Sequence, residues 1–286
     1  MKISKPLTMT RICSYLVVLV LGFAGVAGAH ETGVKHEEPS VATPAVSNAK
    51  ERIRAKYSTD LTAAREAKEA YRALKRTESA QKQLAAVKTY GRKMFEVRQK
   101  VLADYPNRQR GKQCADADNQ TINTSVAASQ TILRSALANL DAATEVAAAK
   151  LIVKSAIEQT RVFAVFAPAA NGLCRSSRLT AQIDLRLTKA INVLKVAGEQ
   201  VESLTGHLTQ ARTEAMAAHN IYQELVAAPN YPDTAPAKAK FAQAKSHLDR
   251  AKDQLTAFKN ALSALKQTLD AKSKLPPRNE KTEVVP

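Results

Sequence analysis

Two stretches of this chain repeat small or apolar residues every three or four positions, and this spacing constrains the fold more than any other feature. The longer stretch runs from Leu179 to Leu225, and the shorter one from Phe241 to Leu269. Steps of three and four place these side chains on one face of an α-helix, as in helices that pack knobs-into-holes. The pattern predicts two long helices, at about 176–228 and 236–273.

A third long helix is predicted at about 48–104. This stretch has no proline and one glycine, Gly91, and its apolar residues recur with helical spacing. Tyr105-Pro106-Asn107 marks the predicted end, because the residue before a proline avoids helical geometry. The chain has no Trp and is 5% aromatic, so Ala-rich helices must lie close together around a narrow core. We therefore expect an all-α fold, an elongated antiparallel bundle formed by residues 48–274 as one domain.

The first 29 residues have the pattern of a signal peptide. A positively charged start is followed by the apolar run 12–26 and then by Ala27-Gly28-Ala29, the small residues that a signal peptidase accepts. A membrane-spanning anchor is the alternative, but it needs roughly 20 apolar residues and this run is shorter. We expect cleavage near Ala29 and a secreted or cell-surface protein, with a flexible lead-in at 30–47 and a disordered tail at 275–286.

Removal of the leader leaves two cysteines, Cys114 and Cys174, and an exported chain favours a disulfide between them. Two free thiols, or a bond to another chain, are the alternatives. Residues 119–167 lack Gly and Pro, but a continuous helix would hold the cysteines farther apart than the roughly 7 Å that a disulfide allows between Cα atoms. A pairing therefore requires a bend, expected at Asn139-Leu140-Asp141. The prediction is a disulfide-closed helical head at 105–175 added to three long helices; a four-helix bundle with unpaired cysteines is the alternative.

Positive charge is concentrated in the first part of the bundle. Residues 50–112 hold 18 Lys and Arg against 7 Asp and Glu, whereas residues 113–286 hold 21 against 16. One interpretation is a solvated helix face whose charges neighbouring helices neutralise. The other is a basic strip that attracts an extracellular protein or another anionic macromolecule. Nucleic acid is not an expected partner, because the chain is exported and contains no visible recognition module. The densest loop cluster, and the candidate binding site, consists of Tyr105, Arg108, Arg110 and Lys112.

Other motifs add little chemistry. Two sequons follow Cys114 and would carry glycans at Asn119 and Asn123 in a eukaryotic secretory path. The catalytic signatures His-Glu-x-x-His and Gly-x-Ser-x-Gly and the glycine-rich phosphate loop do not occur. His207 and His219 lie about 18 Å apart on one predicted helix, too far to share a metal ion. We therefore predict no enzyme activity, no cofactor and no metal site.

The export leader, Ala-rich helices of more than fifty residues, one expected disulfide and the clustered sequons together resemble the extended helical-bundle surface proteins of African trypanosomes. That group includes the haptoglobin–haemoglobin receptor and alanine-rich coat proteins, and the resemblance is one of architecture without a shared motif. It implies a membrane-distal ligand-binding region and a C-terminal lipid anchor. An anchor signal needs a hydrophobic tail, and the sequence ends KTEVVP. Either the sequence stops before that signal, or the protein is not anchored this way.

Three functions agree with these features. The favoured one is a cell-surface receptor that binds a host macromolecule, such as a serum protein, through its head and basic strip. The second is a structural surface coat protein with no ligand. The third is a bacterial periplasmic or lipid-binding helical protein whose amphipathic faces open onto a membrane. Saturable binding to a specific ligand, weakened by salt, would distinguish the first from the others.

Overall fold

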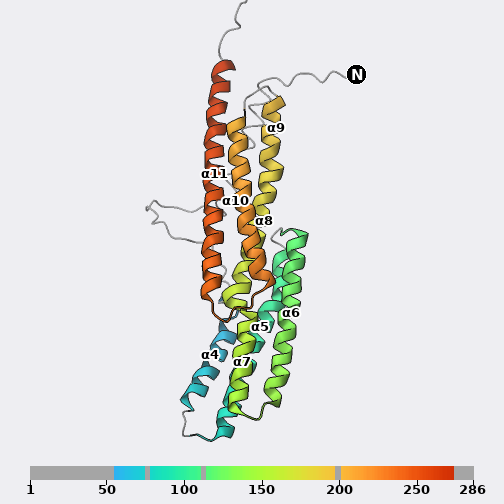
Figure 1. Cartoon of the computed structure of the whole chain (residues 1–286), viewed down its shortest axis with the longest axis vertical. Coiled ribbons are helices and arrows are strands. Elements are labelled where there is room, and N and C mark those ends of the chain that lie inside the picture. The colour runs from blue at the N-terminus through green and yellow to red at the C-terminus, as the bar shows by residue number, and fades with distance from the viewer. Residues whose placement is uncertain (1–54, 75–77, 111–113, 197–200, 274–286) are drawn as a thin grey trace, which may run out of the picture. The chain divides into compact units, whose positions relative to one another are not determined.

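The computed structural model describes residues 55–74, 78–110, 114–196 and 201–273, and over these ranges it is all-helical without strands, which confirms the predicted all-α bundle. Contacts divide it into two compact units, each described here by itself (Figure 1). Of the described residues, unit 1 contains 181–196, 201–213 and 249–273, and unit 2 contains 55–74, 78–110, 114–180 and 214–248. The elements are α4 (Ser58–Ala73), α5 (Ala80–Arg110), α6 (Asp116–Ala142), α7 (Val146–Thr160), the π-helix η1 (Val162–Phe166), α8 (Ala167–Gln182), the π-helix η2 (Ile183–Leu187), α9 (Thr188–Val196), α10 (Glu202–Ala227) and α11 (Ala235–Ser273).

Helix α5 is the central element of unit 2, where it contacts α4, α6 and α7 (Figure 1). Its inward face carries the buried side chains Phe95 and Leu102. Gly91 allows the close approach of two neighbours, because a Cβ atom there would lie 2.5 Å from a methyl group of Leu140 on α6 and 2.6 Å from one of Val153 on α7. The single glycine of this helix is thus placed where three helices meet.

The predicted helix at 48–104 is, over the described residues, two helices that pack against each other. Helix α4 ends at Ala73 and α5 begins at Ala80. Ser79 stands immediately before α5, where its Oγ accepts a hydrogen bond from the backbone nitrogen of Lys82 at 3.4 Å. A serine in this position satisfies a backbone donor that the first turn of a helix leaves unpaired, so it favours a new start.

The predicted helix end at Tyr105 is also wrong, because α5 continues through Pro106 to Arg110. Pro106 cannot donate a backbone hydrogen bond to the carbonyl of Leu102. Contacts with α8 and η1 hold this turn of α5: the Tyr105 ring packs edge-on against Phe166, with ring centroids 5.0 Å apart, and its hydroxyl donates to the carbonyl of Ala167 at 2.6 Å. Tertiary packing here outweighs the local preference against helix.

The chain doubles back between the two cysteines. Cys114 and Cys174 form a disulfide with Cα atoms 4.6 Å apart, which confirms that prediction and contradicts the alternative with unpaired cysteines. The bend falls at residues 143–145, where Ala143 and Glu145 have extended backbone. It therefore follows the predicted position by a few residues, and Asp141 belongs to the last turn of α6.

The apolar stripes predicted for the second half of the chain face inward. The predicted helix at 176–228 corresponds to α8, η2, α9 and α10, with residues 197–200 outside the described part, and α11 matches the prediction at 236–273. In unit 1, the Nδ1 atom of His207 on α10 lies 2.9 Å from Oε1 of Gln254 on α11. The described members of the two stripes that are fully buried are Ile183, Leu187, Ala190, Leu194, Val201, Leu204, Leu208, Ala211, Ala215, Ala218, Tyr222, Leu225, Ala244, Leu248, Ala251, Phe258 and Leu262.

The predicted signal peptide (1–29), lead-in (30–47) and tail (275–286) lie outside the described residues. Among the helices that are described, none combines the length and the apolar character needed to cross a membrane.

Candidate functional site

The predicted binding cluster around Tyr105 is not a surface loop. Tyr105 is 1% exposed, and its hydroxyl also accepts a hydrogen bond from Nδ2 of Asn171 at 3.1 Å. Its assignment as a ligand-binding residue is therefore corrected, because the side chain joins α5 to α8 inside unit 2. Arg108 and Arg110 belong to α5 by their backbone, but their side chains lie outside the described part, as does Lys112 entirely. A binding role for these three stays a prediction.

Three basic side chains of the strip pair with acidic groups of neighbouring helices. Lys100 on α5 donates to Oδ1 of Asp60 on α4 at 2.7 Å, and Arg92 lies 2.7 Å from Oδ1 of Asp141 on α6. Lys56 pairs with Asp104 in the same way. For these described residues, the arrangement favours the interpretation of a solvated, neutralised helix face over that of an exposed anion-binding strip.

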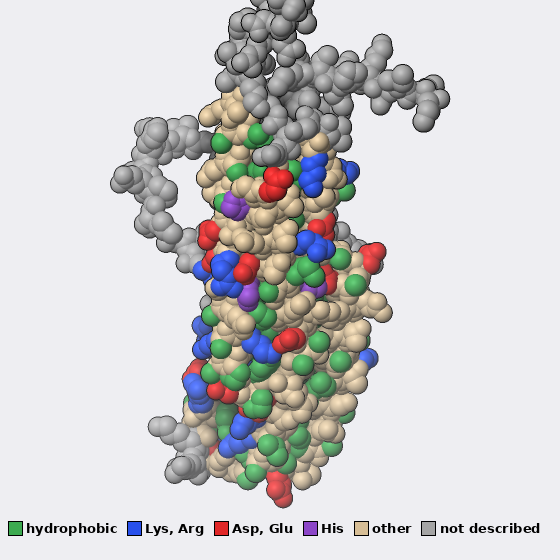
Figure 2. Space-filling view, turned by 45° about the horizontal axis from the view of Figure 1, so that its top comes forward, with side chains coloured by type: hydrophobic (Ala, Val, Ile, Leu, Met, Phe, Trp, Pro, Cys, Tyr) green, Lys and Arg blue, Asp and Glu red, His purple; other side chains and the backbone are tan. Residues whose placement is uncertain are grey.

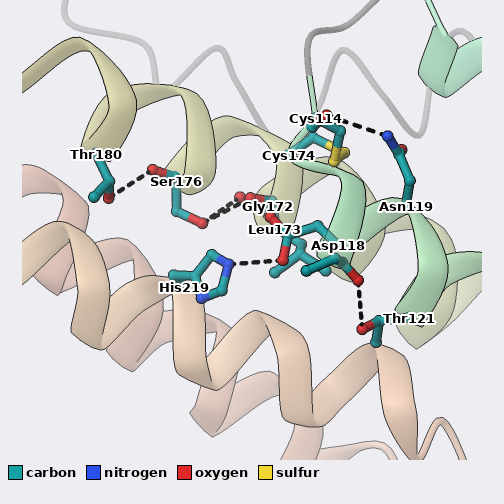
Figure 3. Close-up of polar contacts among 11 residues, drawn as sticks. Cys114, Asp118, Asn119, Thr121, Gly172, Leu173, Cys174, Ser176, Thr180 and His219 are labelled. Atoms are coloured by element: carbon teal, nitrogen blue, oxygen red, sulfur yellow. Dashed lines mark hydrogen bonds and ion pairs between the residues drawn. A yellow bond between two sulfur atoms is a disulfide. The ribbon is translucent and has the colours of Figure 1, made fainter. Parts of the chain in front are cut away.

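The two predicted glycosylation sites differ in accessibility. Figure 3 shows Asn119 beside the disulfide, where its Nδ2 donates to the carbonyl of Cys114 at 3.1 Å. That nitrogen is the atom to which a glycan would be attached, so a glycan would crowd this contact. Asn123, one turn later on α6, is exposed. Glycosylation stays a prediction, and Asn123 is the more accessible position.

A partly buried contact between a histidine and an aspartate lies next to the disulfide. Nε2 of His219 on α10 lies 2.9 Å from Oδ1 of Asp118 on α6, and Asp118 is 3% exposed (Figure 3). The hydrogen bond with Asp118 raises the pKa of His219 above its ordinary value. The pair joins two helices and does not form a metal centre, since no three His, Cys, Asp or Glu side chains gather anywhere in the described ranges.

Unit 2 has a hollow along α6, which we call the α6 groove. Its first section has a volume of about 620 Å³ and lies between α6, the end of α7 and the connection from α10 to α11. Its second section, of about 420 Å³, continues between α6 and α7, and both sections include Ile132 and Gln159. The polar residues of the first section are Gln120, Thr121, Thr124, Ser125, Ser129, Gln159, Gln223 and Asn230.

The α6 groove has an unusual composition for this chain. The two sections are lined by 22 different residues, none of them Asp, Glu, Lys or Arg. The chain is 24% charged, so about five charged residues would be expected among 22. In Figure 2, charged side chains are likewise sparse on the lower right of the visible face, where hydrophobic and uncharged polar ones mix. The groove is thus suited to a neutral partner that both donates and accepts hydrogen bonds.

Ser125 stands out among the residues of the groove. It is 5% exposed, and its Oγ is buried with no hydrogen-bond partner among the described residues. A buried hydroxyl without a partner costs about 1–3 kcal/mol. Such a group needs an explanation, and a ligand or water that supplies a partner would remove this cost.

Arg161 positions one wall of the groove. It has φ 30° and ψ 40°, the left-handed region that non-glycine residues rarely adopt, and it lies between α7 and η1. Its Nε donates to the carbonyl of Tyr231 at 2.6 Å, and its Nη2 donates to the carbonyl of Pro232. These bonds hold the connection between α10 and α11 against the end of α7. The same connection supplies Asn230 to the groove.

Reasoning from the sequence missed this groove, although α6 contains a signal that points to it. Between Asp118 and Arg134, fifteen consecutive residues are uncharged, while exposed positions such as Gln120, Thr124 and Ala128 recur every four residues. A surface helix in a chain this rich in Lys and Glu normally carries charge on its outer face. Comparison with known protein families, curated proteins and solved structures finds no match for the chain.

Proposed function

We propose that the protein is an exported, cell-surface helical-bundle receptor and that it binds a macromolecule, such as a host serum protein, through the α6 groove of unit 2. The predicted signal peptide supports export, and the likeness to trypanosome surface receptors supports the same class. The single observation that carries the proposal is the uncharged lining of a groove of about 620 Å³ in a chain of formal net charge +17. A coat protein that only shields a membrane has no need of such a surface.

A matched pair of variants on α6 tests this proposal. Ala128 lines the groove, whereas its neighbour Ala127 is also exposed on the same helix but does not line it. Ala128→Trp fills the groove, and Ala127→Trp adds the same bulk beside it. Labelled protein that starts at His30 is titrated against an immobilised serum protein fraction, with unlabelled protein as competitor and circular dichroism as the check on folding.

The receptor function predicts saturable, competable binding that Ala128→Trp weakens by about tenfold or more, equivalent to 1.4 kcal/mol or more, while Ala127→Trp leaves it unchanged. Equal loss in both variants would show that the groove is not the site. No saturable binding by the wild-type protein would favour the structural coat instead.

The basic cluster is tested in the same assay. Arg108, Arg110 and Lys112 are reversed together to Glu, and the salt concentration is varied. Binding through this cluster would weaken steeply with salt, because exposed charges more than about 10 Å apart are largely screened at 0.1 M. Binding through the α6 groove would change little with salt and would survive the charge reversal.

A further inference from the structure

The two sections of the α6 groove follow one another along the same helix. They share residues, and on α6 their lining extends from Ala117 to Asn139. At 1.5 Å per residue this is about 33 Å of helix. A compact small molecule would occupy only a part of a groove of this length. An extended chain rises about 3.3 Å per residue, so roughly ten residues would fill it.

The side chains along the α6 groove offer the hydrogen-bond donors and acceptors that a peptide backbone requires. Gln120, Gln159, Gln223 and Asn139 each carry an NH₂ donor and a carbonyl acceptor, so each can bond both groups of a peptide unit. Ala128 and other small residues between them leave room for the side chains of a ligand. No aromatic residue is found among the described residues that line the α6 groove. The groove therefore lacks the aromatic side chains on which sugar rings usually stack.

The second section adds an apolar contact. Leu151 on α7 lines it and is 66% exposed, more than any other large hydrophobic residue in the described part of the chain. Ile152 and Asn139 line the same section of the groove. Covering this side chain with an apolar group of a ligand would be favourable at about 25 cal/mol per Å².

From this placement we infer that the α6 groove binds an extended, uncharged peptide segment of about ten residues, with small side chains and one larger apolar side chain over Leu151. The inference rests on the proposed receptor function and specifies its ligand. The absence of charged lining residues excludes acidic and basic segments by desolvation, because a charged side chain placed in the groove would lose water without gaining an ionic partner. Ser125 also lines the groove, and its buried Oγ has no hydrogen-bond partner among the described residues.

The test uses a displayed library of random ten-residue peptides and the full chain from His30. Wild-type protein is expected to enrich peptides without Asp, Glu, Lys or Arg. Synthetic versions of these peptides should bind equally at about 0.05 and 0.5 M salt. Ala128→Trp should weaken them by about tenfold or more, and Leu151→Ser should weaken those with a large apolar residue at one end. Ala127→Trp is the matched control and should change nothing.

Other outcomes separate this inference from the proposed function. A panel of neutral oligosaccharides is measured in parallel, and groove-dependent binding of a sugar with no enriched peptide would overturn the inference. Enrichment of acidic peptides, or binding that Ala127→Trp and Ala128→Trp weaken alike, would also overturn it. If no peptide is enriched while serum protein still binds in a groove-dependent way, the inference fails and the receptor function stands. If wild-type protein binds neither, both fail.

Discussion

Nε2 of His219 lies 2.9 Å from Oδ1 of Asp118, so an ionisable contact joins α10 to the first turn of α6 inside unit 2. The disulfide at Cys114 lies one turn away along the chain (Figure 3). The carboxylate is almost fully buried, whereas the His219 side chain is 24% exposed. This end of α6 is therefore held by one covalent bond and one bond that depends on protonation.

The raised pKa of His219 predicts that stability falls as pH rises. Because the folded state binds the proton more tightly than the unfolded state, the contribution is fully present below the ordinary His pKa of about 6.5. It is lost as pH rises through the higher pKa of the folded state. The loss is expected to be on the order of 1 kcal/mol, since the partly exposed ring is screened by solvent.

Urea unfolding between about pH 5.5 and 8.5 measures this effect, with His219→Gln as the comparison. The difference in unfolding free energy between wild type and variant should shrink with increasing pH. Asp118→Asn should remove the same pH dependence while keeping the shape of the side chain. A difference that stays constant across this range would show that the contact does not titrate.

Two glycines should respond to alanine in opposite ways. A Cβ atom on Gly172 would lie 2.4 Å from the ring of Tyr222, whereas one on Gly206 would meet nothing within 4 Å. Gly206→Ala should stabilise the protein by up to about 1 kcal/mol, because alanine favours helix. Gly172→Ala gains the same propensity but overpacks a buried contact, so we expect a net loss of about 1–2 kcal/mol. Thermal unfolding of both variants gives the comparison, and equal shifts in Tm would contradict it.

The buried guanidinium of Arg98 is predicted to cost stability. Its Nη1 donates to the carbonyl of Met94 at 3.0 Å and the group lies 5.3 Å from the Phe163 ring centroid, but its Nε has no hydrogen-bond partner among the described residues. Burial lowers the pKa of Arg98 to about 10. Arg98→Met fills similar space without charge and should stabilise the folded protein against unfolding by about 1–2 kcal/mol. A clear loss of stability in chemical denaturation would instead show that the charge is well compensated.

The side chain of Arg161 stabilises the folded protein, whereas its left-handed backbone conformation costs stability. Arg161→Ala should cost about 2–3 kcal/mol, because two carbonyls of the α10–α11 connection lose a charged donor. Arg161→Gly loses the same bonds but relieves the left-handed backbone, so it should be less damaging by about 1 kcal/mol. Hydrogen exchange should rise at residues 228–234 in both variants. Unchanged exchange there would mean that Arg161 does not hold the connection.

The features predicted correctly from sequence are those where one physical constraint dominates. The stripe that includes Leu204, Leu208 and Ala211 is buried because it places apolar side chains along one face of α10. The doubling back between Cys114 and Cys174 follows from the reach of a disulfide. In each case a local pattern and the tertiary structure impose the same requirement, which makes the pattern a reliable guide.

The errors arise where tertiary contacts outweigh local signals. Pro106 normally ends a helix, but the buried Tyr105 next to it anchors the turn. The break before Ala80 has no Gly or Pro, and Ser79 was the only local sign of a new helix start. The α6 groove could not be inferred from α6 alone, because Gln159 and Asn230 reach it from distant parts of the chain.

The disulfide between Cys114 and Cys174 closes a loop that contains the exposed turn at Thr144 and Glu145. A protease that cuts this turn would separate α6 from α7 in the backbone, yet the two fragments would remain one covalent molecule. Nicked and intact protein would therefore migrate together on a non-reducing gel and separate only after a reductant is added. A chain with this arrangement tolerates a cut at this exposed turn without shedding either half.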